Sequence, residues 1–391
     1  MSGPIRNPRE DRDPPGAEPA VYAARARRAY TAMQSRFRTR SGGYRRDGLL
    51  HAPGAAAHLW PLSRALVATL DLAGVRSDLV QGFDAEAAIA ERLDALEHYW
   101  EPAGRAPGYS SDILGTRLGG DRYYDDNAWV GLALVQLERM RPGAGRLERA
   151  AELFRFAVSG WDRRADAPSP GGVFWVEQGR GEGARNHDRN TVSNAPNAEL
   201  GLHLAELTGG PVGAAGSIGT QEMYEWVNAT LDAGASADAP ATGLFWDKIR
   251  GDNTLDETLW SYNQGSMIGA NVLLDRSRGG DAPAPYLQRA ETIARKALRY
   301  YDGRYESQPA AFNAIFFRNL LLLHAVTGDT GLRAQIIEAM HVYADRAWSE
   351  CRDRRDCFRF SRRGVTLLDQ SAMVQLLALL AWDPAEYRKL A

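Results

Sequence analysis

Two kinds of helical segment alternate along this chain. In one kind, such as 147–161, apolar residues recur every three or four positions and the opposite face is charged. In the other kind, such as 312–326, nearly every position is apolar. A helix with one polar face lies at a surface, whereas a helix that is apolar all round is buried. The alternation therefore predicts buried helices covered by amphipathic ones.

Each kind occurs six times, in strict alternation. The amphipathic segments are 21–37, 85–100, 147–161, 221–231, 286–301 and 332–348. The apolar segments are 59–72, 127–140, 197–207, 265–274, 312–326 and 369–382. Such a repeat of helical hairpins predicts an all-α fold, an (α/α)6 barrel of twelve helices with an inner ring of six inside an outer ring of six. An open solenoid is disfavoured because the inner segments are too uniformly apolar and the connections too long. We expect a single barrel domain over residues 20–391.

The connections that lead into the apolar segments are long and rich in glycine and aromatic residues. Examples are 42–44, 171–175 and 242–247, whereas the opposite connections are mostly shorter and contain glycine, as at 208–210 and 327–329. Ordered loops on a rigid scaffold commonly carry function. We therefore expect the functional site at the end where the inner helices begin, with residues 177–190 forming a mobile loop at its rim.

The composition narrows the class of protein. The chain has 391 residues, of which 44% are hydrophobic and 25% charged, and a formal net charge of -2. It therefore lacks the basic surface that nucleic acid requires. No stretch approaches the roughly 20 apolar residues of a membrane span. Residues 1–19 are polar and lack the apolar core of a secretory signal, so we expect a disordered tail and a cytoplasmic location.

The strongest chemical signal is a pair of adjacent aspartates, Asp125 and Asp126, in the sequence Tyr-Tyr-Asp-Asp-Asn-Ala-Trp at 123–129. Two neighbouring carboxylates do not both ionise cheaply, so one becomes a proton donor while the other stays anionic. Aromatic rings beside them suit a sugar-binding cleft. The alternative interpretation is a helix start, where aspartates cap the backbone and favour the helix dipole.

Other inner helices also open on polar or aromatic residues before the apolar run, at 193–197, 261–264 and 312–313. Capping explains each one singly, but together they would meet in one cleft. Tryptophans in such a cleft would stack on sugar faces, whereas the scattered histidines, His58 among them, are interpreted as structural. The predicted substrate-binding residues are Tyr123, Tyr124, Asn127, Trp129, Trp175, Asn194, Trp246, Asp247, Tyr262, Asn263 and Gln264.

The two cysteines of the chain, Cys351 and Cys357, lie six positions apart in a charged segment. A disulfide-closed loop and two free thiols are both compatible with this spacing. Without further cysteines or histidines nearby the pair is a poor zinc site. We expect neither a metal nor an organic cofactor, since hydrolysis by two carboxylates needs none.

From about residue 21 to about residue 382 the chain resembles glycoside hydrolase family 76, the α-1,6-mannanases. The resemblance rests on the motif at 123–129, on Ser-Tyr-Asn-Gln-Gly at 261–265, on the Gly-Val-Phe-Trp and Gly-Leu-Phe-Trp-Asp loops, and on the helix order. It implies a retaining, endo-acting hydrolase of α-1,6-linked mannan or mannooligosaccharides. In that case Asp125 is the nucleophile and Asp126 the acid/base, and retention asks for carboxyls about 5 to 5.5 Å apart.

Two other readings stay open. One is a glycan-binding barrel that has lost catalysis, although both aspartates are present. The other is a related (α/α)6 hydrolase, or an epimerase, that acts on another sugar. An epimerase would need catalytic histidines at the ends of inner helices, and the scattered histidines here argue against it.

Overall fold

The computed structural model describes residues 18–46, 55–115, 120–167, 169–210, 212, 219–235, 243–278, 285–362 and 364–391. The predicted tail, 1–19, falls outside these ranges except for its last two residues, because the first helix begins at Glu18. The odd-numbered α-helices are α1 (Glu18–Phe37), α3 (Ala85–Glu97), α5 (Leu147–Ser159), α7 (Thr220–Thr230), α9 (Pro285–Tyr301) and α11 (Thr330–Arg346). The even-numbered ones are α2 (Leu59–Gly74), α4 (Tyr124–Met140), α6 (Thr191–Thr208), α8 (Ser261–Ser277), α10 (Ala310–His324) and α12 (Leu367–Leu379).

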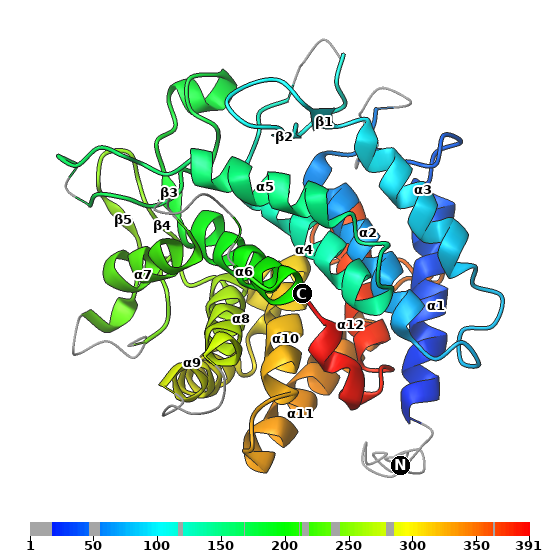
Figure 1. Cartoon of the computed structure of the whole chain (residues 1–391). Coiled ribbons are helices and arrows are strands. Elements are labelled where there is room, and N and C mark those ends of the chain that lie inside the picture. The colour runs from blue at the N-terminus through cyan, green and yellow to red at the C-terminus, as the bar shows by residue number, and fades with distance from the viewer. Residues whose placement is uncertain are drawn as a thin grey trace.

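The even-numbered helices form the inner ring. Each packs against the next, from α2 through α4, α6, α8 and α10 to α12, and α12 packs against α2. In α10 every residue except Phe312 and His324 is buried, as expected for a helix that is apolar all round. The odd-numbered helices surround this ring (Figure 1). The predicted (α/α)6 barrel is therefore confirmed.

The outer helices bury one face each. In α9 the buried residues are Ala290, Ile293, Ala294, Ala297, Leu298 and Tyr301. This spacing of three and four residues places them on one side of the helix, against α8. Burial of that apolar stripe against the inner ring, rather than helix propensity, holds each outer helix in place.

Short strands lie in the loops at the end where inner helices begin. Strands β1 (Trp100–Glu101) and β2 (Gly108–Tyr109) pair antiparallel. Strands β3 (Arg189–Asn190), β4 (Lys248–Ile249) and β5 (Leu255–Asp256) form a second antiparallel sheet in that order, near α6 and α7 (Figure 1). Asn190 is paired with Lys248 in this sheet. The register ties the residue before α6 to the loop that leads toward α8.

A further extended segment, 173–176, crosses from the start of α4 to the start of α6. Bridges pair Val176 with Tyr123 and Phe174 with Arg189. Gly172 enters this segment with a φ of +83°, and a Cβ there would lie 2.5 Å from the Trp226 ring. Glycine is therefore required for the backbone to reach this position.

The cysteines and the lengths of the helices bear on the disulfide and on a membrane span. Cys351 and Cys357 are both free thiols. Across the described ranges, every helix is too short or too polar to pass through a bilayer.

Candidate active site

The starts of five inner helices surround a cavity of about 510 Å³. Inner helices α2, α4, α6, α8 and α10 contribute side chains, and the loops between them supply the rest. The lining residues are His58, Trp60, Pro61, Ser111, Tyr123, Asp125, Asp126, Trp129, Trp175, Asn190, Val192, Asp247, Lys248, Tyr262 and Phe312.

The aspartate pair lies in the first turn of α4, whose N-cap residue is Tyr123. The backbone N–H of Asp126 donates to Oδ1 of Asp125 at 3.0 Å. At the next residue, the Asn127 amide donates to the carbonyls of Tyr123 at 2.7 Å and of Tyr109 at 3.0 Å. The start of α4 is thereby tied to β2, and both aspartates face the cavity.

Segment 173–176 brings Trp175 onto Asp125. The carbonyl of Trp175 accepts from the N–H of Tyr124 at 3.0 Å, and its own N–H donates to the carbonyl of Asp188 at 2.8 Å. With the backbone fixed on both sides, the indole Nε1–H donates to Oδ2 of Asp125 at 3.1 Å. The ring packs against Tyr123 with centroids 4.9 Å apart.

The two aspartates differ in their electrostatic surroundings. Burial raises the pKa of Asp125 to about 7, although the hydrogen bonds from Trp175 and the backbone oppose that rise. Burial, and then the neighbouring charge of Asp125, raise the pKa of Asp126 well above its ordinary value. Desolvation and like charge both disfavour a second anion. The protein thus favours one proton on the pair, held by Asp126.

A third carboxylate, Asp247, faces the pair from the loop before β4. Burial raises its pKa to about 6, while the nearby Lys248 ammonium opposes the rise. Asn263 donates to Asp247 at 3.4 Å, and Lys248 forms an ion pair with Asp188 at 2.9 Å. Burial and the carboxylates of Asp247 and Asp125 raise the pKa of Tyr262, so its hydroxyl stays neutral.

Aromatic rings also form part of the cavity wall. The rings of Tyr262 and Phe312 stack with centroids 3.8 Å apart and planes within 6° of parallel. Trp60 also lies near Phe312, with ring centroids 6.0 Å apart and planes tilted by 39°. Flat apolar faces and carboxylates in one cavity match the two chemistries of a sugar ring, whose C–H faces are apolar and whose rim carries hydroxyls.

The structure brings seven predicted site residues to the cavity. These are Tyr123, Asp125, Asp126, Trp129, Trp175, Asp247 and Tyr262. The other six, which do not line it, are Tyr124, Asn127, Asn194, Trp246, Asn263 and Gln264. Tyr124 stacks on Phe156 at 4.5 Å, and the carbonyl of Trp246 accepts from the Thr191 hydroxyl at 2.6 Å.

Three of the amide side chains away from the cavity share one arrangement, which we call the amide anchors. Asn127, Asn194 and Gln264 each accept a hydrogen bond from the N–H of one loop residue and donate to the carbonyl of the same residue. Their partners are Tyr109, Val173 and Phe245, respectively. Two of the anchored residues, Val173 and Phe245, stand two positions before Trp175 and Asp247, whose side chains line the cavity.

Sequence reasoning missed six lining residues, namely Trp60, Pro61, Ser111, Asn190, Val192 and Lys248. It expected Phe312 only as the opening residue of an inner helix, and it interpreted His58 as structural. His58 does contact Asp112, at 3.0 Å, while also lining the cavity. Trp60 and Phe312 stand in the first turn of α2 and α10. Their place at the opening of an apolar segment was the signal that would have found them.

The loop at 177–190 lies at the cavity rim. The Tyr123 hydroxyl donates to Glu182 at 2.6 Å, and Arg180 forms an ion pair with Glu101 at 2.8 Å. The contact with Tyr123 places the loop beside the aspartate pair. The mobility expected of this loop stays a prediction.

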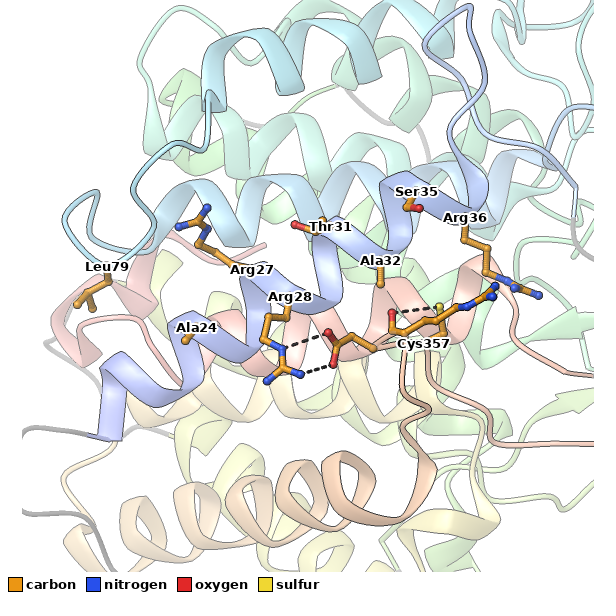
Figure 2. Close-up of a pocket in the computed structure, with 11 residues that line it drawn as sticks. Ala24, Arg27, Arg28, Thr31, Ala32, Ser35, Arg36, Leu79 and Cys357 are labelled. Carbon is orange, nitrogen blue, oxygen red and sulfur yellow. Dashed lines mark hydrogen bonds and ion pairs between the residues drawn. The ribbon is translucent and has the colours of Figure 1, made fainter.

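A larger hollow, of about 730 Å³, lies on the outer face of α1 (Figure 2). Arginines from α1 border it, and Arg28 is paired with Asp356 at 2.8 Å. Asp356 also pairs with Arg352. This hollow has neither a carboxylate pair nor an aromatic wall, so the inner cavity is the candidate site. In the part of the chain that the structure describes, no three His, Cys, Asp or Glu side chains gather into a potential metal site.

Comparison with known proteins places this geometry in context. The model of Glycosyl hydrolase family 76 matches residues 22–381. A family 76 glycoside hydrolase from a bovine Bacteroides thetaiotaomicron strain superimposes with a TM-score of 0.74 at 19% identity, over 92% of this chain and 77% of the other. No match was found among curated proteins.

Two further solved structures share the fold. One is an inactive variant of the α-1,6-mannanase GH76A of Salegentibacter sp. HEL1_6, with two consecutive aspartates replaced by asparagine, in complex with α-1,6-mannotriose. It gives a TM-score of 0.69 at 18% identity, over 92% of this chain and 99% of the other. The other is cellobiose 2-epimerase from Spirochaeta thermophila DSM 6192, with a TM-score of 0.61 at 15% identity, over 94% and 98%.

Proposed function

Because the chain belongs to glycoside hydrolase family 76 and is a glycoside hydrolase, we propose that it cleaves α-1,6-linked mannan with retention of the anomeric configuration. The observation that carries the proposal is the Asp125–Asp126 pair at the start of α4, one member hydrogen-bonded as an anion and the other favoured as the acid. The α-1,6-mannanase of Salegentibacter, inactive when two consecutive aspartates are replaced together, supports a catalytic role for such a pair.

The reaction proceeds in two displacements. In the first, Asp125 attacks the anomeric carbon while Asp126 gives its proton to the leaving glycosidic oxygen, which forms a covalent glycosyl ester and frees one part of the chain. In the second, the Asp126 carboxylate removes a proton from water, and that water displaces Asp125 from the anomeric carbon. Both carboxyls return to their starting protonation states.

The cavity walls supply the binding contacts. The stacked rings of Tyr262 and Phe312 offer an apolar face to a sugar ring. Asp247, buried beside the aspartate pair, accepts hydrogen bonds from sugar hydroxyls, and Lys248 keeps it anionic by opposing the rise in its pKa. A neutral, hydroxyl-bearing chain fits this arrangement.

A second candidate is an epimerase, since the fold also resembles a cellobiose 2-epimerase. Among the residues that line the cavity, His58 is the one histidine, and it contacts Asp112. Proton abstraction beside a carbonyl by paired histidines therefore has no support at this site, whereas glycoside hydrolysis has two carboxylates in place.

The test is the set of products from linear α-1,6-mannan and short α-1,6-mannooligosaccharides, with Asp125→Asn and Asp126→Asn run alongside. Oligosaccharides released as α-anomers by the parent, and by neither variant, would support the proposal. Products formed first as β-anomers would contradict retention. Binding without cleavage would favour a glycan-binding barrel, and a change at C2 of a disaccharide would favour the epimerase.

A further inference from the structure

The two adjacent aspartates differ in the hydrogen bonds that their carboxyls accept. Both oxygens of Asp125 accept hydrogen bonds, from the backbone N–H of Asp126 at 3.0 Å and from the indole of Trp175 at 3.1 Å. Each donor is an N–H group that is unable to accept. A proton on Asp125 would therefore weaken both bonds, because a neutral carboxyl accepts less strongly than a carboxylate. The carboxyl of Asp126, by contrast, receives no hydrogen bond from any described residue.

Trp175 is held where it is by the backbone on both sides of its ring. The bond from Tyr124 and the bond to Asp188 fix its peptide groups, and the Tyr123 ring lies 4.9 Å from its own. The indole N–H is thus directed at Asp125 without a substrate present. A pre-positioned donor stabilises an anion at no reorganisation cost when the reaction occurs.

Other charged and titratable groups also face Asp125. Asp247 opposes the effect of Trp175 because its charge raises the pKa of Asp125. Lys248 is paired with Asp188, and its ammonium lies 5.9 Å from the Trp175 ring. Tyr262 on α8 is neutral, and His58 before α2 is paired with Asp112. Among the side chains around Asp125, Trp175 is the largest influence that favours its anion.

We propose that Trp175 is a positioning residue whose indole N–H keeps Asp125 the anionic member of the pair and so keeps the proton on Asp126. The two aspartates are chemically identical neighbours, so their roles must be set from outside. Beside the backbone bond from Asp126, one side-chain hydrogen bond from a residue 50 positions away in sequence sets them. The catalytic meaning of this inference rests on the proposed function, whereas the position of the proton on the pair is measurable without a substrate.

The experiment is a titration that needs no substrate. Protein labelled with ¹³C at the aspartate carboxyl is followed by NMR across pH, with Asp125 and Asp126 assigned from the two asparagine variants. Because the two carboxyls titrate as a coupled pair, the titration curve has two midpoints that belong to the pair as a whole. In the parent we expect Asp125 to ionise at the lower one. In Trp175→Phe, which keeps an aromatic ring and loses the N–H, that midpoint should rise by about one pH unit, a tenfold change in proton affinity.

Two further proteins separate the hydrogen bond from general disturbance of the loop. Replacement of Trp175 by benzothienylalanine keeps the shape of the indole and removes only the N–H, so it should give the same rise even if the phenylalanine variant folds poorly. Trp246→Phe makes the same chemical change outside the cavity and should leave both midpoints in place. Unchanged midpoints with benzothienylalanine, or a parent in which Asp126 ionises first, would overturn the proposal. Absence of mannan cleavage would overturn the proposed function and leave this titration as informative as before.

Discussion

Arg122 and Glu177 form a buried ion pair that joins the residue before the Tyr-Tyr-Asp-Asp motif to the end of the segment that carries Trp175. The guanidinium Nε donates to Oε2 of Glu177 at 2.8 Å, and a second nitrogen donates to the carbonyl of Ala106 at 2.8 Å. The backbone closes the same contact, since the N–H of Glu177 donates to the carbonyl of Arg122 at 2.9 Å. The start of α4 and the Trp175 segment are thereby held as one unit.

Breaking this ion pair should destabilise the protein strongly. In Glu177→Gln the buried guanidinium loses its counter-charge, and we expect the free energy of unfolding to fall by about 3 to 5 kcal/mol. Chemical denaturation followed by tryptophan fluorescence measures it. Glu182→Gln, in the exposed part of the same loop, is the matched control and should cost less than about 1 kcal/mol. Equal losses in the two variants would contradict the role given to the pair.

Removal of the acid/base should depend on the leaving group. In Asp126→Asn we expect kcat on α-1,6-mannooligosaccharides to fall by about 10² to 10⁴-fold, because the sugar oxygen leaves unprotonated. Loss on a nitrophenyl α-mannoside, whose phenolate leaves without a proton, should be much smaller. Asp125→Asn lacks the nucleophile and should lose both activities alike. Similar behaviour of the two variants on both substrates would speak against the assigned roles.

The pH profile should follow the two aspartates. The pKa of Asp125, raised by burial to about 7, sets the acid limb, so kcat/KM should rise with pH and reach half its maximum near pH 7. Burial and the charge of Asp125 raise the pKa of Asp126 further, so the fall comes at higher pH, as the acid loses its proton. Initial rates at low substrate concentration give both limbs. An acid limb near pH 4 would show that Asp125 titrates as an ordinary aspartate.

Neutralising the third carboxylate, Asp247, should shift the acid limb of the pH profile to lower pH. The charge of Asp247 raises the pKa of Asp125, so Asp247→Asn should shift the acid limb to lower pH, by up to about one pH unit. KM should rise as well, because a hydroxyl acceptor is weakened. Asp252→Asn, at the exposed turn between β4 and β5, is the control and should leave the limb in place. A shift to higher pH would refute the electrostatic account.

The aspartate pair should also limit stability at high pH. A carboxyl whose pKa is higher in the folded protein than in the unfolded chain binds more protons when folded, so stability falls as pH rises between the two values. Burial raises the pKa of Asp126 in this way. At pH 8 the free energy of unfolding of Asp126→Asn should therefore exceed that of the parent by at least about 1 kcal/mol. This difference should shrink toward pH 4. The pKa of Asp78 is lowered by its bond to Arg76, so Asp78→Asn should instead be less stable than the parent at pH 8, and this difference should shrink as the pH falls.

The outer helices were predicted more closely from the sequence than the starts of the inner ones. Segment 286–301 became α9 (Pro285–Tyr301), because burial of one face leaves a clear period in the sequence. The apolar segment 197–207, in contrast, is only part of α6 (Thr191–Thr208), which begins two residues before Ser193, the residue expected to open that helix. Its first turns contain Ser193 and Asn194, which bond to loop backbone rather than pack in a core. Polar first turns hide the beginning of a helix from any argument based on apolar periodicity.

The site was visible in sequence only where its residues are contiguous. Asp125 and Asp126 are neighbours in the chain, so their coupling follows from the sequence alone. The pairing of Lys248 with Asp188 depends on the path of two loops and on the register of β3 with β4. The substrate linkage and the cytoplasmic location stay predictions.

The amide anchors have a consequence for how this barrel changes over evolution. Asn127, Asn194 and Gln264 bind the N–H and carbonyl of a loop residue, groups that every residue except proline carries. A mutation in an anchored loop can therefore replace a side chain at the cavity without releasing the backbone from its place. Such a scaffold can exchange its sugar contacts one at a time, and new substrate preferences can arise without a loss of folding at each step.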